Sequence, residues 1–346
     1  MKTNGFIAVC AGLTSFVFLL VFWNPFANGL SLGLANCAKI VIPSLFPFLI
    51  AASLTGSGEI PAKAKTILNP ITQRLFHLPA ESLPVIILSQ LGGYLSGAKA
   101  AESLYRAGTL NKSQAERLLL FGVNSGIGFS VNAIGTVMLG SRKSGIILLI
   151  SLCISSLIVG FMTRFLPQKD SEVKKLVSHP PSFSFALVES VSSSAQAMLA
   201  ACAFVTVFSG LTAVLDSLIK SENLKLAAAC LLEVTNGCIN TAGKVSLPAL
   251  AAICAFGGIC VHMQVFAVAK SISVKIPLFY LFRFLHSALA FITCRITLYF
   301  FPIETQVFLS VSENVRLWSF SAPSSVSLLL LSALLILDLD NKKKIC

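Results

Sequence analysis

The stretch from Leu231 to Gly243 reads LLEVTNGCINTAG, and it contains Glu233, the most informative residue of the chain. Glu233 lies inside an apolar segment, and threonine, asparagine and glycine follow it. Glycine costs about 1 kcal/mol relative to alanine in a helix interior. A carboxylate surrounded by hydrocarbon is costly and marks a functional site by default. The stretch therefore predicts a helix that breaks inside a membrane, with Glu233 at the break.

Three more segments have the same character, because each combines half a membrane span of apolar residues with glycine, asparagine or serine. Unwound backbone is tolerated in a bilayer only where it is buried in protein or lines a wet cavity. The alternative is that these glycines let helices pack closely. Four such segments in two matching pairs favour broken helices and re-entrant hairpins. The other three segments are 83–99, 118–136 and 255–264.

The composition places the chain in a membrane. Hydrophobic residues make up 55% and charged residues 12% of its 346 residues, and the mean hydropathy is +0.84. Soluble domains carry roughly 25% charged residues. A spanning helix needs about 20 apolar residues, and we expect such helices at 5–23, 40–56, 144–166, 195–219, 276–301 and 319–338. The basic residues after the last of these predict a cytoplasmic C-terminus.

The chain also predicts an internal repeat. Residues 40–165 and 190–300 both read as apolar helix, broken helix, glycine-rich segment and spanning helix. In this alignment 89–93 matches 233–237, and 124–127 matches 256–259. We therefore expect an all-α polytopic protein with two repeats, in an inverted arrangement. The expected units are an N-terminal transmembrane helix (1–28), a first repeat (29–166), a polar linker (167–189), a second repeat (190–302), and a C-terminal transmembrane helix with a basic tail (303–346).

Other classes of function have no support in the sequence. The net charge of +12 comes from basic residues scattered over short connections, as in membrane topology signals, so we expect no nucleic-acid partner. The ten cysteines have no metal-ligand spacing. No nucleophile elbow, P-loop, zinc motif or dinucleotide fingerprint is present. We expect a protein that is not an enzyme and has no cofactor or metal.

The candidate site residues lie at the four breaks. Glu233 has two possible roles, as the carrier of a proton or cation or as the acceptor of hydrogen bonds from a solute; structurally, it could instead pair with Lys99, Arg283 or an unwound backbone N–H. Lys99 is expected where a broken helix restarts, as part of an anion site, or as a lysine snorkelling at a helix end. His262 and His286 join Glu233 as candidates for ion coupling. The full set of predicted solute-binding residues is Gly93, Tyr94, Ser96, Lys99, Asn124, Ser125, Gly126, Glu233, Thr235, Asn236, Gly257, Gly258 and Gln264.

These motifs resemble the YlbJ-type, or SpoVV, sporulation integral membrane proteins. They belong to the Gate (nucleoside-recognition) superfamily, which is similar to concentrative nucleoside transporters. The likeness covers residues 30–300, although Leu95 stands where family members often have proline. It rests on GYLSGAK at 93–99, NSG at 124–126, EVTNG at 233–237, FGGICVHMQ at 256–264 and RFLH at 283–286, with PSLFPF at 43–48.

The resemblance implies a transporter for dipicolinate, a small aromatic dicarboxylate, in a spore-forming bacterium. It places the chain in the cytoplasmic membrane, as the outer forespore membrane of sporulating cells. A dianion fits two half-helix N-termini, Lys99 and asparagine donors. A negatively charged Glu233 is a poor direct contact for a dianion. We therefore expect Glu233 to carry a proton or cation that offsets the charge of the solute, or to pair with a basic residue.

Two other functions stay open at this point. One is a transporter or channel of the same fold for a nucleoside-like or other small solute. The other is a non-transporting membrane scaffold for assembly of the spore envelope. A homo-oligomer is compatible with the sequence, which contains no signature of an oligomer interface.

Overall fold

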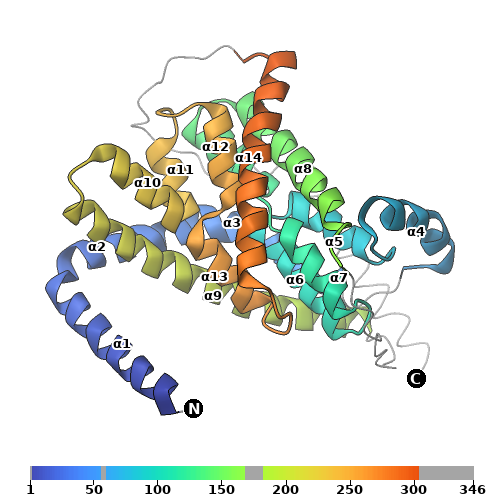
Figure 1. Ribbon diagram of the computed structural model, residues 1–346, viewed down its shortest axis with the longest axis horizontal. Coiled ribbons are helices and arrows are strands. Elements are labelled where there is room, and N and C mark those ends of the chain that lie inside the picture. The colour runs from blue at the N-terminus through green and yellow to red at the C-terminus, as the bar shows by residue number, and fades with distance from the viewer. Residues whose placement is uncertain (1, 56–59, 168–181, 304–346) are drawn as a thin grey trace.

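The computed structural model describes residues 2–55, 60–167 and 182–303, and this part of the chain is helical with no strand (Figure 1). The all-α class is therefore confirmed. The first half contains α1 (Lys2–Val21), α2 (Trp23–Asn36), η1 (Cys37–Val41), α3 (Ile42–Thr55), α4 (Ala62–Phe76), α5 (Ser82–Leu91), α6 (Tyr94–Arg106), α7 (Lys112–Phe121), η2 (Gly128–Met138) and α8 (Arg142–Thr163). The second half contains α9 (Phe183–Leu218), α10 (Glu222–Leu232), α11 (Val234–Thr241), α12 (Leu247–Phe256), α13 (Gly258–Val268) and α14 (Ile276–Phe300). The elements η1 and η2 are π-helical.

Within the described residues, five helical runs are long and apolar enough to cross a membrane. They are Trp23–Thr55, Arg142–Thr163, Phe183–Leu218, Leu247–Val268 and Ile276–Phe300. The polytopic membrane class is consistent with these five runs. The helix expected at 319–338 and the basic tail lie outside the described residues.

Two boundaries differ from the sequence prediction. The helices expected at 5–23 and 40–56 are joined by further helix, so the chain is helical from Trp23 to Thr55, and the boundary expected at residue 28 falls inside α2. The helix expected to begin at 195 begins at Phe183, inside the expected linker. Small serines allow this extension, because Ser190 and Ser194 are buried and Ser193 lies 3.1 Å from Ser53 of α3.

All four predicted helix breaks are confirmed. The helix pair α5 and α6 breaks at Gly93, and α12 and α13 break at Gly257, where φ is 97° and 85°. These left-handed conformations favour glycine. The pair α7 and η2 is separated by a non-helical segment at 122–126. The pair α10 and α11 breaks at Glu233, whose backbone is extended.

The helices follow the same order in the two halves: a long helix, two broken helices and a second long helix. That the halves are structural repeats stays a prediction. The alignment needs a correction in the first pair of breaks. Gly93 and Glu233 each directly precede a restarting half-helix, so the structure matches these two residues. The sequence alignment had instead matched residue 89 with residue 233, a difference of one helical turn.

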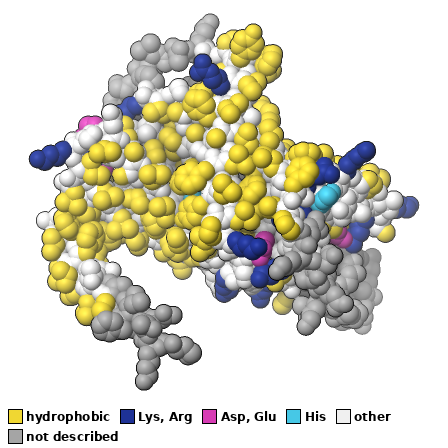
Figure 2. All heavy atoms as spheres, in the orientation of Figure 1, with side chains coloured by type: hydrophobic (Ala, Val, Ile, Leu, Met, Phe, Trp, Pro, Cys, Tyr) yellow, Lys and Arg dark blue, Asp and Glu magenta, His cyan; other side chains and the backbone are white. Residues whose placement is uncertain are grey.

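Apolar side chains cover the face of the molecule shown in Figure 2, where α2, α9 and α14 lie, and lysines and arginines gather at its margins. Large apolar side chains of these helices are well exposed, including Leu199 (74%) on α9 and Phe284 (59%) on α14. Such a continuous apolar surface is unusual for a soluble monomer. It suits contact with lipid chains.

Candidate functional site

The four helix breaks meet in the interior of the molecule. A Cβ atom added to Gly126 would lie 2.3 Å from the Gly93 nitrogen, which places the first two breaks in contact. A Cβ atom added to Gly258 would lie 3.2 Å from the Leu232 carbonyl oxygen, so the last two breaks are also in contact. The Tyr94 hydroxyl joins the two halves, because it donates to the Cys254 carbonyl at 2.9 Å.

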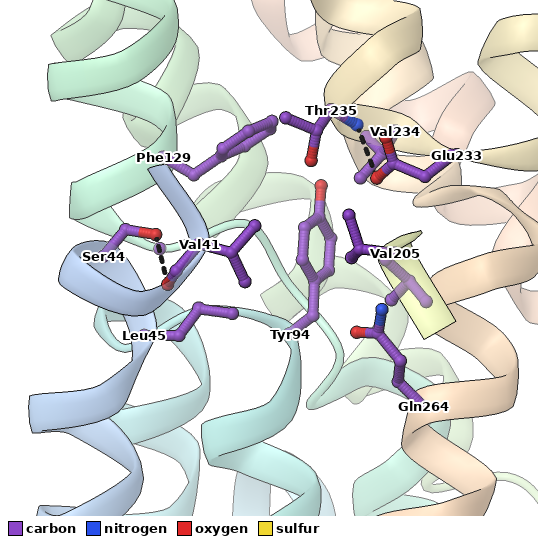
Figure 3. A pocket seen from close by; sticks show the side chains of 12 residues that line it. Val41, Ser44, Leu45, Tyr94, Phe129, Val205, Glu233, Val234, Thr235 and Gln264 are labelled. Atoms are coloured by element: carbon purple, nitrogen blue, oxygen red, sulfur yellow. Dashed lines mark hydrogen bonds between the residues drawn. The ribbon is translucent and has the colours of Figure 1, made fainter. Parts of the chain in front are cut away.

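A small cavity lies where the breaks meet (Figure 3). Its volume is about 30 Å³, which is enough for one or two water-sized particles. Residues at or shortly after each break line its wall, and so do residues of α3, α9 and both π-helical segments. The lining residues are Val41, Ser44, Leu45, Tyr94, Gly126, Phe129, Val205, Glu233, Val234, Thr235, Val261 and Gln264.

Glu233 is the only acidic or basic side chain of this lining. It is 1% exposed, and its two oxygens accept the N–H groups of Thr235 at 2.9 Å and Asn236 at 2.7 Å. The carboxylate thereby caps the N-terminus of α11, where the helix dipole favours negative charge. Of the structural roles expected for Glu233, the structure shows the bond to unwound backbone N–H groups. None of the ion pairs found among the described residues includes it.

Besides Ser44, whose hydroxyl donates to the Val41 carbonyl at 3.2 Å, three neutral side chains bring further oxygen atoms to the cavity. The hydroxyls of Tyr94 and Thr235 point toward one another beside the Glu233 carboxylate, and the Gln264 amide lies below them (Figure 3). Gln264 donates through Nε2 to the Ala201 carbonyl and to Cys260 Sγ, which leaves its oxygen available to the cavity. The site can therefore bind one small polar or charged particle through oxygen atoms.

Asn124 and Ser125 are fully buried, and their hydrogen bonds go to other groups of the protein. The Asn124 amide donates to Gln90 Oε1 at 2.9 Å, and its oxygen accepts the Ser125 N–H at 2.9 Å. Gln90 continues the chain of bonds to Ser156 at 3.0 Å. This network secures the non-helical segment after α7 to α5 and α8. Neither Asn124 nor Ser125 lines the cavity.

Asn236 has a similar role in the second half. Its amide donates to Ser209 Oγ of α9 at 2.8 Å, and its oxygen accepts from Asn36 of α2 at 2.9 Å. The three side chains are buried. They secure α11 to α2 and α9 next to the cavity without lining it. Asn36 was not among the predicted residues, because an isolated asparagine gives no sign of a partner 200 positions away.

Arg283 connects the ends of two half-helices. Its guanidinium donates to the carbonyls of Leu120 (2.7 Å) in the last turn of α7, Val123 (2.5 Å) just after α7, and Ala255 (3.4 Å) in α12. The side chain is fully buried. His262 makes a related contact, since its Nε2 lies 2.8 Å from the Phe256 carbonyl. Both residues satisfy backbone carbonyls that the breaks leave without helical partners.

Lys99 lies outside the cavity lining. The expectation that it marks the restart of a broken helix is wrong, because α6 begins at Tyr94 and Lys99 is in its second turn. Burial, and to a smaller extent Arg106, lowers the pKa of its ammonium group; Glu102, Glu189 and Lys270 act on the same group. The helix α6 is not one of the five long apolar runs, and Lys99 belongs to a mixed cluster of charges.

The structure thus brings Tyr94, Gly126, Glu233, Thr235 and Gln264 together around one cavity. The predicted residues that do not line it are Gly93, Ser96, Lys99, Asn124, Ser125, Asn236, Gly257 and Gly258, together with the coupling candidates His262 and His286. His286 is fully buried on α14, where its Nε2 lies 3.5 Å from the Leu152 carbonyl.

Sequence reasoning missed most of the apolar wall. Val41 of η1, Phe129 of η2 and Val205 of α9 line the cavity, and no local signal separates them from the other apolar residues. Ser44 lies between Pro43 and Pro47, and its position in the sequence gives no sign that it faces a cavity. Each of the two π-helical segments contributes a residue to the cavity wall, and π-helical segments often occur at functional sites.

Among the described residues, no group of three or more histidine, cysteine, aspartate or glutamate side chains is placed to hold a metal ion. Comparison of the chain with known protein families, characterised proteins and solved structures finds no match.

Proposed function

We propose that this chain is a membrane transporter that moves a small solute past the meeting point of the four helix breaks. One observation carries the proposal: a cavity with a buried carboxylate lies between half-helices from both halves of the chain. Interrupted helices in corresponding positions of two halves are the usual setting of a transporter's central site. A scaffold would not require an ionisable group there, and intramembrane charge is expensive.

Transport requires movement of the half-helices. The cavity of about 30 Å³ holds only one or two water-sized particles, so an organic solute enters only after part of the wall has separated. The breaks at Gly93, Glu233 and Gly257 are the natural hinges, since no helical hydrogen bonds continue through them. Alternating separation on the two sides of the membrane would give the solute access from each side in turn.

Dipicolinate is the solute that the family resemblance supports, with the outer forespore membrane as the location. The charge of the lining sets a condition on this choice. Glu233 is its only charged residue, and no lysine or arginine borders the cavity. A dianion therefore binds only if a proton or cation neutralises Glu233. An uncharged nucleoside meets no such condition, and this makes it the second candidate.

The test is uptake of radiolabelled dipicolinate, and in parallel of uridine, into proteoliposomes that hold the purified chain. Inward proton and sodium gradients are applied separately. Saturable uptake of dipicolinate is the expected result, with strong loss in Glu233→Gln. Glu222→Gln is the matched control, because Glu222 is exposed on α10 and pairs with Lys225. Absence of uptake of both solutes would reject the transporter and favour the scaffold.

A further inference from the structure

Glu233 has an unusual electrostatic setting. Both carboxylate oxygens accept a short backbone N–H bond, which is the arrangement of an ionised carboxylate. The side chain is buried, and no lysine, arginine or histidine borders the cavity that it faces. Two N–H groups and the dipole of an eight-residue helix offset only part of a full negative charge. An ion buried without a counterion is costly, so the ionised form of Glu233 requires a cation or a proton beside it.

The cavity beside Glu233 has the size and chemistry of a place for that charge. Its volume of about 30 Å³ matches one or two water-sized particles. Oxygen atoms of Glu233, Tyr94, Thr235 and Gln264 border it, and Figure 3 shows the two hydroxyls directed to the same space as the carboxylate. Tyr94 donates its hydrogen to the Cys254 carbonyl, and its oxygen lies beside the Thr235 hydroxyl and the Glu233 carboxylate.

We propose that this cavity binds a single small monovalent cation, with sodium as the first ion to test. Hard cations prefer oxygen ligands, and unwound segments of transporter helices are common places for coupling ions. A divalent ion fits less well, because calcium takes six to eight oxygen ligands and magnesium keeps several of its waters. One carboxylate balances one positive charge.

The inference rests on the proposed function for its meaning, because a bound cation would supply the neutralisation that a dianionic solute requires. If this is correct, the cation binds next to Glu233 before the solute does. The cation and the solute are then released from the same cavity. It differs from protonation of Glu233 in a measurable way, since a cation site responds to the identity of the salt at constant pH.

The experiment measures thermal unfolding of the full purified chain in detergent, without solute or gradient. Sodium chloride is titrated against N-methyl-D-glucamine chloride at constant ionic strength and pH. A ligand that binds only the folded state raises the unfolding midpoint, and we expect a saturable rise of about 5 °C. Potassium and lithium chlorides show whether the site selects by size. Glu233→Gln should abolish the rise, and Glu222→Gln on the exposed turn should retain it.

A second variant covers the case that Glu233→Gln does not fold. Tyr94→Phe keeps the ring and removes one oxygen, so the sodium concentration at half-saturation should increase about tenfold. A wild-type midpoint that ignores sodium, potassium and lithium would overturn the proposal, as would an undiminished rise in Glu233→Gln. A midpoint that changes with pH but not with salt identity would assign the missing charge to a proton. Sodium binding without uptake of either solute would reject the transporter and leave the cation site standing.

Discussion

Arg283 shows how one residue can hold two half-helices together. Its guanidinium donates to carbonyls at the C-terminal ends of α7 and α12, and these helices belong to different halves of the chain. Backbone carbonyls at helix C-termini carry partial negative charge, and inside a bilayer no water can satisfy them. The planar fork of arginine reaches several of them at once.

The first prediction concerns this arginine. Arg283→Leu should lower the free energy of unfolding by about 3 kcal/mol, because it removes charge-assisted hydrogen bonds and leaves buried carbonyls unsatisfied. Arg283→Lys should lie between wild type and Arg283→Leu, since one ammonium group cannot bond both helix ends. Unfolding in detergent measures the effect. Arg295→Leu, on the exposed face of the same helix, should change it by no more than about 0.5 kcal/mol.

The second prediction separates a structural from a solute-binding role for Asn124. Its amide bonds Gln90 and the Ser125 N–H, so Asn124→Ala should destabilise the protein by about 1 to 2 kcal/mol. The KM of the surviving uptake should stay near the wild-type value. Exposed Asn69 of α4 provides the control, as Asn69→Ala should alter neither quantity. A raised KM with an unchanged unfolding midpoint would place Asn124 on the solute.

At the scale of elements, the breaks are the places where backbone contacts backbone. The segment after α7 passes so close to the α5–α6 break that only a glycine fits at position 126. The close approach brings the N-terminus of α6, and with it Tyr94, to the cavity. Direct contact between their backbones therefore helps to fix the positions of α6 and the segment after α7, in addition to the packing of side chains.

Gly126→Ala tests this close approach. The new methyl group would lie 2.3 Å from the Gly93 nitrogen and 2.6 Å from the Leu91 carbonyl oxygen, so the backbone has to shift. We expect a loss of about 1 to 3 kcal/mol in unfolding free energy, seen in the same unfolding assay. Gly12→Ala in α1 is the matched change, because its Cβ would meet open space. Equal stability of the two variants would contradict the close contact.

At the scale of the molecule, the two halves are held together by contacts that cross between them. Tyr94 bonds Cys254, Arg283 bonds Leu120, and Ser53 lies against Ser193. Residues from both halves line the cavity, so neither half contains the site alone. The site therefore exists only in the assembled chain.

A chain cut between residues 174 and 175 tests this dependence. When the two pieces are produced together, an affinity tag on the first should recover the second in near-equal amount, because the crossing contacts remain. The combined Tyr94→Phe and Arg283→Leu change should reduce the recovered fraction. Pieces that are both present in the membrane but purify separately would show that the halves do not depend on each other.

The sequence by itself determined the helical class and the four segments in which a helix breaks, although it placed the restart after the first break at Lys99 and not at Tyr94. Both depend on local chemistry: apolar length sets the spanning runs, and glycine, asparagine or an isolated glutamate marks a place where a helix cannot continue. Only the tertiary structure decided which of the marked residues face the cavity. A helix turns about 100° and rises about 1.5 Å per residue, so Lys99 lies far from Tyr94 in direction although it is only five positions away. Val41, Phe129 and Val205 reach the same cavity from distant parts of the chain, because helix crossings depend on the packing of all the helices at once.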